Sequence, residues 1–172
     1  PDQIGKQLTQ SLERMQTDHV DIYFMHRDNE DVPVGEFVDA LNREVKAGRI
    51  KDIFGGSNWN QKRMDAAIRY ATKNGLQAPG ALSNNFALAE MVNPVWDGCV
   101  AASDDDWKAW LKRRKIPVFS WSSQARGFFT EAAGRGKFDV PEIVNSWYSP
   151  KNFKRRDRAV KLAAELGRSP IQ

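Results

Sequence analysis

The chain has 172 residues, of which 41% are hydrophobic and 28% are charged, and its net charge is +4. This balance is typical of one globular domain with a sizeable core and excludes an intrinsically disordered chain. No apolar run approaches the roughly 18 residues that a membrane-spanning helix needs, and no signal peptide is visible. Cys99 is the only cysteine, so no internal disulfide can form and we expect a reducing, cytoplasmic environment.

The first part of the chain alternates helical and extended patterns. Apolar residues at helical spacing over residues 4–15 predict an amphipathic helix. Residues 22–25 then form an unbroken apolar run rich in β-formers, which is typical of a strand buried on both faces of a parallel sheet. A second apolar stripe over residues 37–45 predicts a helix that Gly48 ends. A short strand over residues 50–54 follows and leads into a glycine-containing turn.

The same alternation continues through the middle of the chain. A third helix is expected from about residue 61, followed by a weak strand over residues 81–83 and a long connection over residues 84–103. The acidic run at residues 104–106 favours the first turn of a fourth helix. Residues 116–121 indicate a fourth strand.

The last part of the chain is less regular. The tryptophans of the fourth helix, Trp107 and Trp110, are interpreted as packing residues. We expect residues 127–148, which contain Gly134, Gly136 and Pro141, to be irregular. A last helix is expected from about residue 152. The side chains that this helix is expected to bury are Val160, Leu162 and Leu166.

Strands that alternate with helices at this spacing imply right-handed crossovers, a parallel sheet and therefore an α/β fold. Both a doubly wound sheet and a (β/α)8 barrel are compatible with the pattern. A barrel needs eight strands and typically about 250 residues, whereas this chain supplies about four strands. The chain begins at Pro1 and stops at Gln172 in what resembles the start of a helix. We therefore expect residues 1–172 to be a fragment of one domain.

Polar side chains follow the ends of two neighbouring predicted strands. His26 ends the strand at residues 22–25, and Ser57 and Asn58 follow the strand at residues 50–54. A histidine where a strand ends is a candidate acid, base or electrophile. An asparagine amide matches a primary carboxamide because it offers both a donor and an acceptor. The alternatives are a polar strand end without chemistry and a capping motif for the next helix.

The fourth predicted strand ends on Trp121, whose flat ring can stack on a heterocycle. Ser122, Gln124 and Arg126 follow it, with groups that suit a ribose or a phosphate. The alternative is a core tryptophan followed by a polar turn. In a parallel sheet the ends of successive strands share one rim, so we expect a single site there. The strand-end residues expected at this rim are His26, Ser57, Asn58, Ser83 and Trp121.

Two further patterns argue against other kinds of site. His19 and His26 are seven residues apart with no partner pattern, so no metal site is predicted. The basic runs at residues 112–115 and 151–158 are interpreted as solvated helix faces, because a nucleic-acid surface would need its charge clustered on one face. We therefore expect neither a nucleic-acid partner nor a membrane partner.

Three segments, taken in order, carry a resemblance to a known family. Residues 11–15 (SLERM), 18–26 (DHVDIYFMH) and 48–59 (GRIKDIFGGSNW) are together similar to the aldo-keto reductase family. The similarity is close across roughly the first 60 residues and is recognisable at residues 117–127 and 166–170. The combination is specific, although no single segment would be.

This resemblance implies a (β/α)8 TIM barrel that reduces a small aldehyde or ketone with NADPH or, alternatively, NADH. It implies that His26 orients the substrate carbonyl and that Ser57 and Asn58 hold the nicotinamide carboxamide. Trp121 falls where the family has an aromatic ring, usually tyrosine, stacked on the nicotinamide. The family's loop beside the cofactor ribose and pyrophosphate contains, in this chain, Ser122, Gln124 and Arg126.

The chain also departs from the family pattern. Ser83 stands where a glutamine is usual, which weakens that carboxamide contact or leaves it to Asn84, and Gly56 replaces a small aliphatic residue. The resemblance implies that the family's catalytic tyrosine, lysine and aspartate would precede Pro1. It also implies that the segment that binds the adenosine 2′-phosphate would follow Gln172. We therefore expect the chain to be inactive alone. The alternative to an enzyme is a cofactor-binding regulatory subunit, similar to the β-subunits of potassium channels.

Overall fold

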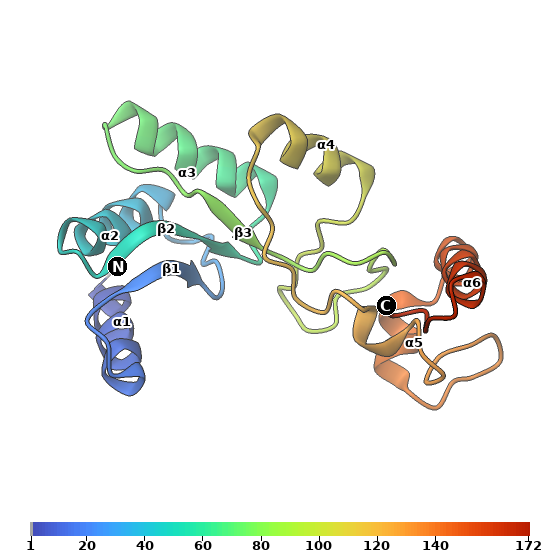
Figure 1. Ribbon diagram of the computed structural model, residues 1–172. Coiled ribbons are helices and arrows are strands. Elements are labelled where there is room, and N and C mark those ends of the chain that lie inside the picture. The colour runs from blue at the N-terminus through green and yellow to red at the C-terminus, as the bar shows by residue number, and fades with distance from the viewer. Residues whose placement is uncertain (1) are drawn as a thin grey trace. The chain divides into compact units, whose positions relative to one another are not determined.

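The computed structural model describes residues 2–172 (Figure 1). These residues form two compact units. The first unit holds the residues up to Ser83 together with Arg114–Phe119, and the second holds Asn84–Arg113 together with Ser120–Gln172. Each unit has buried apolar side chains of its own.

The first unit is a three-stranded parallel sheet with helices along it. Its strands run in the order β1-β2-β3, and α2 packs against both α1 and α3 (Figure 1). Each connecting helix joins a strand to its parallel neighbour, as the alternation in the sequence predicts. The elements are α1 (Asp2–Met15), β1 (Val20–Met25), α2 (Val34–Lys46), β2 (Ile50–Ser57), α3 (Gln61–Lys73) and β3 (Ala81–Ser83).

The register of this sheet places the ends of its strands together. Met25 of β1 lies opposite Gly56 of β2, and Ser57 of β2 lies opposite Ser83 of β3. Because the strands are parallel, the residues that follow them meet at one edge of the sheet. The structure thus brings the ends of these three strands together, as expected from the sequence.

The fourth strand, expected over residues 116–121, is present only as isolated bridges. In the first unit Val118 forms a parallel bridge with Leu82, and the N–H of Phe119 donates to the Leu82 carbonyl over 2.8 Å. The Pro117 carbonyl accepts from the Leu82 N–H over 3.1 Å, but Pro117 has no N–H of its own to donate to the ladder. The segment follows the predicted direction, parallel to β3, without forming a continuous strand.

The core of the first unit is made by the apolar stripes of its helices and by β2. One expectation about this core is wrong: Ile22, in a strand predicted to be buried on both faces, is 36% exposed. The reason is that β1 has a single neighbour, β2, among the described residues, so it is an edge strand. The fully buried side chains of this core include Leu8, Val38, Leu41, Phe54 and Met64.

Gly56 and Trp59 form a matched pair at the end of β2. A Cβ atom on Gly56 would lie 2.4 Å from the Trp59 ring, far inside van der Waals contact. The Trp59 ring is 1% exposed and lies 6.1 Å from the ring of Phe37. Trp59 therefore fills the space that a side chain on residue 56 would take, which accounts for the glycine at that position.

The second unit is mainly helical and irregular. Trp107 and Trp110 are buried and meet edge to face with ring centres 5.4 Å apart, so their predicted role in packing is confirmed. A separate cluster in this unit is built around Phe128, Ile143 and Trp147. In chain order the helical elements are α4 (Asp105–Arg114, whose last residue belongs to the first unit), η1 (Ala125–Gly127), α5 (Pro141–Trp147) and α6 (Pro150–Glu165).

Two expectations about these helices can be compared with the structure, and the first is wrong. Residues 127–148, expected to be irregular, contain α5, whose Pro141 takes a first-turn position that needs no N–H donor. The last helix, expected from about residue 152, begins at Pro150. Ser149 caps it, because the Ser149 hydroxyl oxygen accepts a hydrogen bond from the Asn152 N–H over 3.1 Å.

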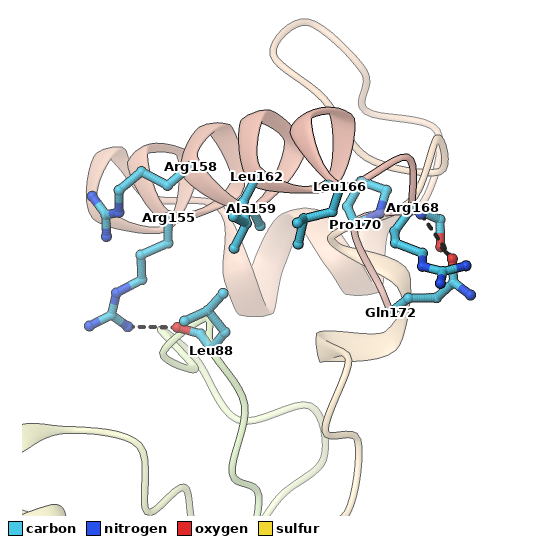
Figure 2. Close-up of a pocket in the computed structure, with 11 residues that line it drawn as sticks. Leu88, Arg155, Arg158, Ala159, Leu162, Leu166, Arg168, Pro170 and Gln172 are labelled. Carbon is cyan, nitrogen blue, oxygen red and sulfur yellow. Dashed lines mark hydrogen bonds between the residues drawn. The ribbon is translucent and has the colours of Figure 1, made fainter.

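α6 also buries a different face from the one that its sequence pattern predicts. Val160, Leu162 and Leu166, expected to be buried, are 38%, 55% and 64% exposed. Leu162 and Leu166 line a cavity of about 610 Å³ together with Leu88 (Figure 2). The start of the helix is instead held by a polar side chain, since Asn152 is fully buried.

None of the helices within residues 2–172 is long and apolar enough to cross a membrane. In the same described part of the chain, no three histidine, cysteine or carboxylate side chains are grouped so that they would hold a metal ion. The polar side chains at the strand ends are bonded instead to one another and to the backbone.

Candidate functional site

The three strand ends of the first unit carry His26, Ser57, Asn58 and Ser83. The side-chain amide of Asn58 donates to the His26 carbonyl and lies within reach of the Ser57 hydroxyl, each over 3.3 Å. The Ser57 hydroxyl donates to the Ser83 carbonyl over 2.7 Å, and the backbone N–H of Asn58 donates to the same carbonyl over 3.2 Å. The structure therefore joins the side chains of Ser57 and Asn58 to the backbone carbonyls of His26 and Ser83.

The backbone turns sharply at Asn58, directly after β2. Its φ angle is +58°, in the left-handed region that asparagine tolerates better than most residues. Ser57 and Asn58 are 6% and 8% exposed, whereas His26 is exposed. The group therefore combines an accessible imidazole with two buried polar side chains.

The alternative that Ser57 and Asn58 cap the next helix is wrong. The cap of α3 is Asn60, whose side-chain oxygen accepts from the Arg63 N–H over 2.8 Å. Ser57 and Asn58 bond back across the ends of the strands instead. Their polar groups therefore fix the edge of the sheet, close to His26.

The loop that follows His26 is held against α3 by a largely buried ion pair. Arg63 Nε lies 2.9 Å from Asp28, and the Arg63 guanidinium also donates to the carbonyls of Asn29 and Val32 over 2.9 and 2.7 Å. Burial is the main influence on Asp28 and raises its pKa, while the Arg63 charge opposes that rise. The sequence does not predict this clamp, because Asp28 and Arg63 are 35 residues apart.

His26 also lies at the wall of a cavity between α1 and β1. The cavity has a volume of about 370 Å³, and Gln7 and Tyr23 line it as well. Burial, supported by the negative charge of Glu44, raises the pKa of Tyr23, so its hydroxyl stays protonated at neutral pH. The cavity falls in the size range of sites for small molecules.

In the second unit, Trp121 is fixed through its backbone by two buried asparagines. The side-chain amide of Asn85 donates to the Trp121 carbonyl over 3.1 Å, and the Trp121 N–H donates to the Asn84 carbonyl over 3.4 Å. Both asparagines are fully buried. The sequence does not predict a role for Asn85. Its one signal is an asparagine doublet directly after a predicted strand.

The loop after Trp121 has a strained backbone. The φ angles of Ser122, Ala125 and Arg126 are +47°, +48° and +51°, in a region that residues other than glycine rarely adopt. Each such residue costs on the order of 1 kcal/mol or more and persists only where its surroundings enforce it, which happens often at functional sites. The structure therefore places Ser122, Gln124 and Arg126 in one tight, enforced turn directly after Trp121.

The ring of Trp121 packs against a second tryptophan. Trp96, from the long connection, lies 6.3 Å away between ring centres, with the two planes tilted by 34°. The guanidinium of Arg126 lies 5.0 Å from the centre of the Trp96 ring and pairs with Glu142. Neither Trp96 nor Glu142 is predicted from the sequence, because both lie away from the ends of the predicted strands.

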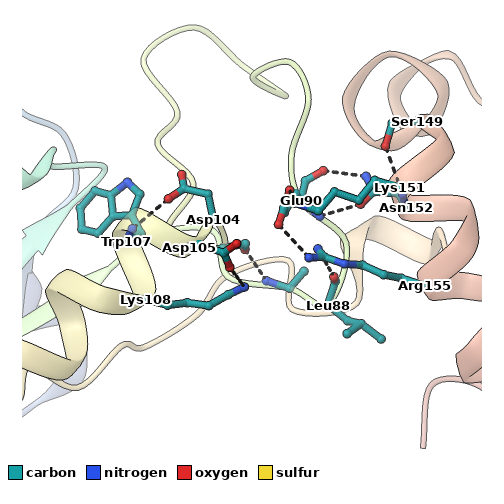
Figure 3. A network of polar contacts seen from close by, with 12 residues as sticks. Leu88, Glu90, Asp104, Asp105, Trp107, Lys108, Ser149, Lys151, Asn152 and Arg155 are labelled. Carbon is teal, nitrogen blue, oxygen red and sulfur yellow. Dashed lines mark hydrogen bonds and ion pairs between the residues drawn. The ribbon is translucent and has the colours of Figure 1, made fainter.

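A charged network ties the long connection to α6 (Figure 3). Glu90 pairs with Lys151 over 2.7 Å and with Arg155 over 2.8 Å, and the side-chain amide of Asn152 donates to the Glu90 carbonyl over 2.7 Å. Burial alone would raise the pKa of Glu90, but the hydrogen bonds from Lys151 and Arg155 lower it. The basic run at residues 151–158, interpreted as a solvated face, is therefore partly structural, since the Arg155 side chain is 14% exposed.

Aldo-keto reductases are among the relatives of this sequence. The family model of the aldo/keto reductase family matches residues 1–172. The chain is 28% identical over 127 residues to the aldo-keto reductase YhdN of Bacillus subtilis, a match that covers 74% of this chain and 33% of that protein. The chain therefore spans about a third of the length of that relative.

Solved structures of the same kind share the fold. A putative 2,5-diketo-D-gluconic acid reductase B superposes with a TM-score of 0.64 at 20% identity, over 98% of this chain and 46% of its own. An aldo-keto reductase from Klebsiella pneumoniae, solved in complex with NADPH, gives 0.63 at 20% identity, over 95% of this chain and 45% of its own. The expected α/β fold, part of a TIM barrel, is confirmed by these likenesses.

Proposed function

Because the chain belongs to the aldo/keto reductase family, we propose that the full-length protein is an oxidoreductase that reduces an aldehyde or a ketone to an alcohol with NADPH. The observation that carries the proposal is the place of the exposed His26 at the ends of parallel strands, where its carbonyl is bonded to Asn58 and Asn58 lies beside Ser57. Active sites of parallel barrels gather at that edge. We expect residues 1–172 alone to be inactive, because they span 33% of the length of the YhdN relative.

The residues of this chain suit a nicotinamide cofactor. Ser57 and Asn58 are buried, and a hydroxyl and an amide are the donor and acceptor types that pair with a carboxamide. A bound carboxamide would replace one of their bonds to the Ser83 and His26 carbonyls. The Trp121 ring offers a stacking surface, and its buried Nε1–H has no hydrogen-bond partner among residues 2–172. Ser122 and Gln124 offer polar groups for the ribose and the pyrophosphate. The complex of the Klebsiella pneumoniae reductase with NADPH supports the same cofactor here.

His26 is the residue that we assign to the substrate. When bound, NADPH supplies the hydride that the carbonyl carbon accepts. The His26 side chain holds the carbonyl oxygen by a hydrogen bond and orients it, and a proton from another residue completes the hydroxyl group. We assign that proton to a tyrosine outside residues 1–172, in keeping with the family resemblance. Positioning and polarisation of the carbonyl are the contributions of this chain.

The experiment that tests this function uses the full-length protein with NADPH and a panel of aldehydes and ketones. We expect NADPH to bind and to be oxidised at a rate that depends on the carbonyl compound. Binding without oxidation by any member of the panel would favour the regulatory subunit. Absence of NADPH binding would overturn the proposal. The same assay with NADH measures the cofactor preference.

A further inference from the structure

We propose that the ring of Trp121 is held for cofactor stacking by an aromatic brace that consists of Trp96, Arg126 and Glu142. The inference rests on the proposed function, which assigns Trp121 to the nicotinamide. In this brace Arg126 is a positioning residue that acts through Trp96, and it does not contact the cofactor phosphates.

The first step is that the orientation of the Trp121 ring depends on packing. A buried tryptophan is usually anchored by a hydrogen bond from its indole N–H. The Nε1 atom of Trp121 is buried, but it has no such partner within the described part of the chain. The ring is instead in contact with Trp96, at 6.3 Å between centres. A change in the position of Trp96 would therefore let the Trp121 ring turn.

The second step is that Trp96 needs support of its own. It is 51% exposed and lies in the long connection outside any helix or strand. The guanidinium of Arg126 lies 5.0 Å from the centre of its ring, within the range of a cation–π interaction. Glu142, in the first turn of α5, pairs with that guanidinium. Glu142 of α5 therefore holds Arg126, Arg126 covers the Trp96 ring, and Trp96 contacts Trp121.

The third step concerns the alternative role of Arg126. Its charge is already paired with Glu142, and its cation already covers the Trp96 ring. A direct contact with a phosphate would require Arg126 to leave both partners. The left-handed backbone at Arg126, with φ of +51°, fixes the point from which the side chain extends. The geometry therefore favours support of Trp96 over a phosphate contact.

The chain offers a matched control for this arrangement. Arg135 lies 5.0 Å from the centre of the Phe153 ring and pairs with Asp157 over 2.8 Å. This is the same combination of ring, cation and carboxylate, and it contains none of the proposed site residues. Arg135→Met therefore removes equivalent contacts without touching the brace.

The experiment measures NADPH affinity by calorimetry on the full-length protein. Trp96→Ala and Arg126→Met should each weaken NADPH binding by about 2- to 12-fold, the range that one aromatic contact supports. Trp96→Phe should restore most of the affinity, and Arg135→Met should leave it unchanged. The sign of the Glu142→Gln effect decides the role of Arg126. Weaker binding supports the brace, whereas tighter binding would mean that a released Arg126 contacts phosphate.

A double variant completes the test. Trp96→Ala combined with Arg126→Met should bind NADPH no more weakly than either single variant, because both remove the same support. Additive losses would overturn the brace, as would single variants that bind as tightly as the wild type. Absence of NADPH binding by the wild type would overturn the proposed function and the brace together. Thermal unfolding checks that each variant folds, and Glu142→Gln, whose effect has opposite signs under the two roles of Arg126, decides the question if the larger changes prevent folding.

Discussion

The two units hold their candidate residues by different means. In the first unit the register of three parallel strands sets the positions of Ser57 and Asn58, and hydrogen bonds to backbone carbonyls fix them. In the second unit Trp121 follows isolated bridges, and its ring is placed by contacts between side chains from loops. The comparison teaches that the positions of Ser57 and Asn58 depend on the backbone. The position of the Trp121 ring depends on neighbouring side chains, so we expect that changing one of them would move the ring.

The largest expected effect is a loss of stability in the first unit. Trp59 is 1% exposed and fills the space above Gly56, so Trp59→Ala should lower the free energy of unfolding by about 3–5 kcal/mol. Trp96→Ala, at a ring that is 51% exposed, should lower it by less than about 1 kcal/mol. Urea unfolding of the full-length variants measures both. Equal losses at the two tryptophans would contradict the distinction between the units.

The next largest effect concerns turnover in the first unit. His26 is exposed at the edge of the sheet, so His26→Ala should lower the rate of NADPH-dependent carbonyl reduction by about 10²- to 10³-fold, as for loss of one positioned hydrogen-bond donor. NADPH affinity should stay nearly unchanged, because Ser57 and Asn58 keep their bonds to the Ser83 carbonyl. Steady-state kinetics and calorimetry separate the two quantities. A loss confined to NADPH binding would mean that His26 has been assigned to the wrong ligand.

The first unit is also the part that could be predicted from the sequence. Periodic apolar residues identified α1, α2 and α3, and the runs at residues 22–25 and 50–54 fall within β1 and β2. Because parallel strands end at one edge, the positions of His26, Ser57 and Asn58 follow from the strands alone. Local patterns therefore carry most of the information about this unit.

The second unit is less predictable because its contacts join distant residues. Trp96 meets Trp121, and Arg155 meets Glu90, 65 residues earlier; no local pattern records such pairs. Periodicity also shows that α6 has an apolar face without showing what covers it, so Leu162 was expected to be buried and is 55% exposed. Burial of side chains in loops depends on tertiary contacts that spacing does not encode.

A smaller effect tests the platform of the second unit. Trp121→Ala should weaken NADPH binding by about 2- to 12-fold, the range of one ring-stacking contact, and Trp121→Tyr should recover most of it. Fluorescence titration of bound NADPH in the full-length protein, with a thermal melt, measures the outcome. If Trp121→Ala instead destabilises the fold by about 3–5 kcal/mol and leaves affinity intact, the ring is a core residue and the platform is wrong.

The smallest expected effects are changes of stability with pH, and they have opposite signs in the two units. Burial raises the pKa of Asp28 above its ordinary value of 3.8, so the folded state holds that proton more tightly than the unfolded state. Its contribution to stability is present below pH 3.8 and is lost as the pH rises through the folded-state pKa. The pKa of Glu90 lies below its ordinary value of 4.5. Its contribution is therefore present above pH 4.5 and is lost as the pH falls through the folded-state pKa.

Asp28→Asn and Glu90→Gln separate these two slopes in urea unfolding of the full-length protein across the acidic range. Relative to the wild type, Glu90→Gln should become more destabilising as the pH rises, up to about 1 kcal/mol, because its partners are partly exposed. Asp28→Asn should become less destabilising as the pH rises from 3.8 through the folded-state pKa of Asp28. The attraction between ionised Asp28 and Arg63 is already part of this slope, because it lowers the folded-state pKa that burial raises. If both variants changed stability with pH in the same direction, the pKa values of Asp28 and Glu90 would be shifted in the same direction. That result would contradict the expected contrast between Asp28, where burial outweighs the ion pair, and Glu90, where the ion pairs outweigh burial.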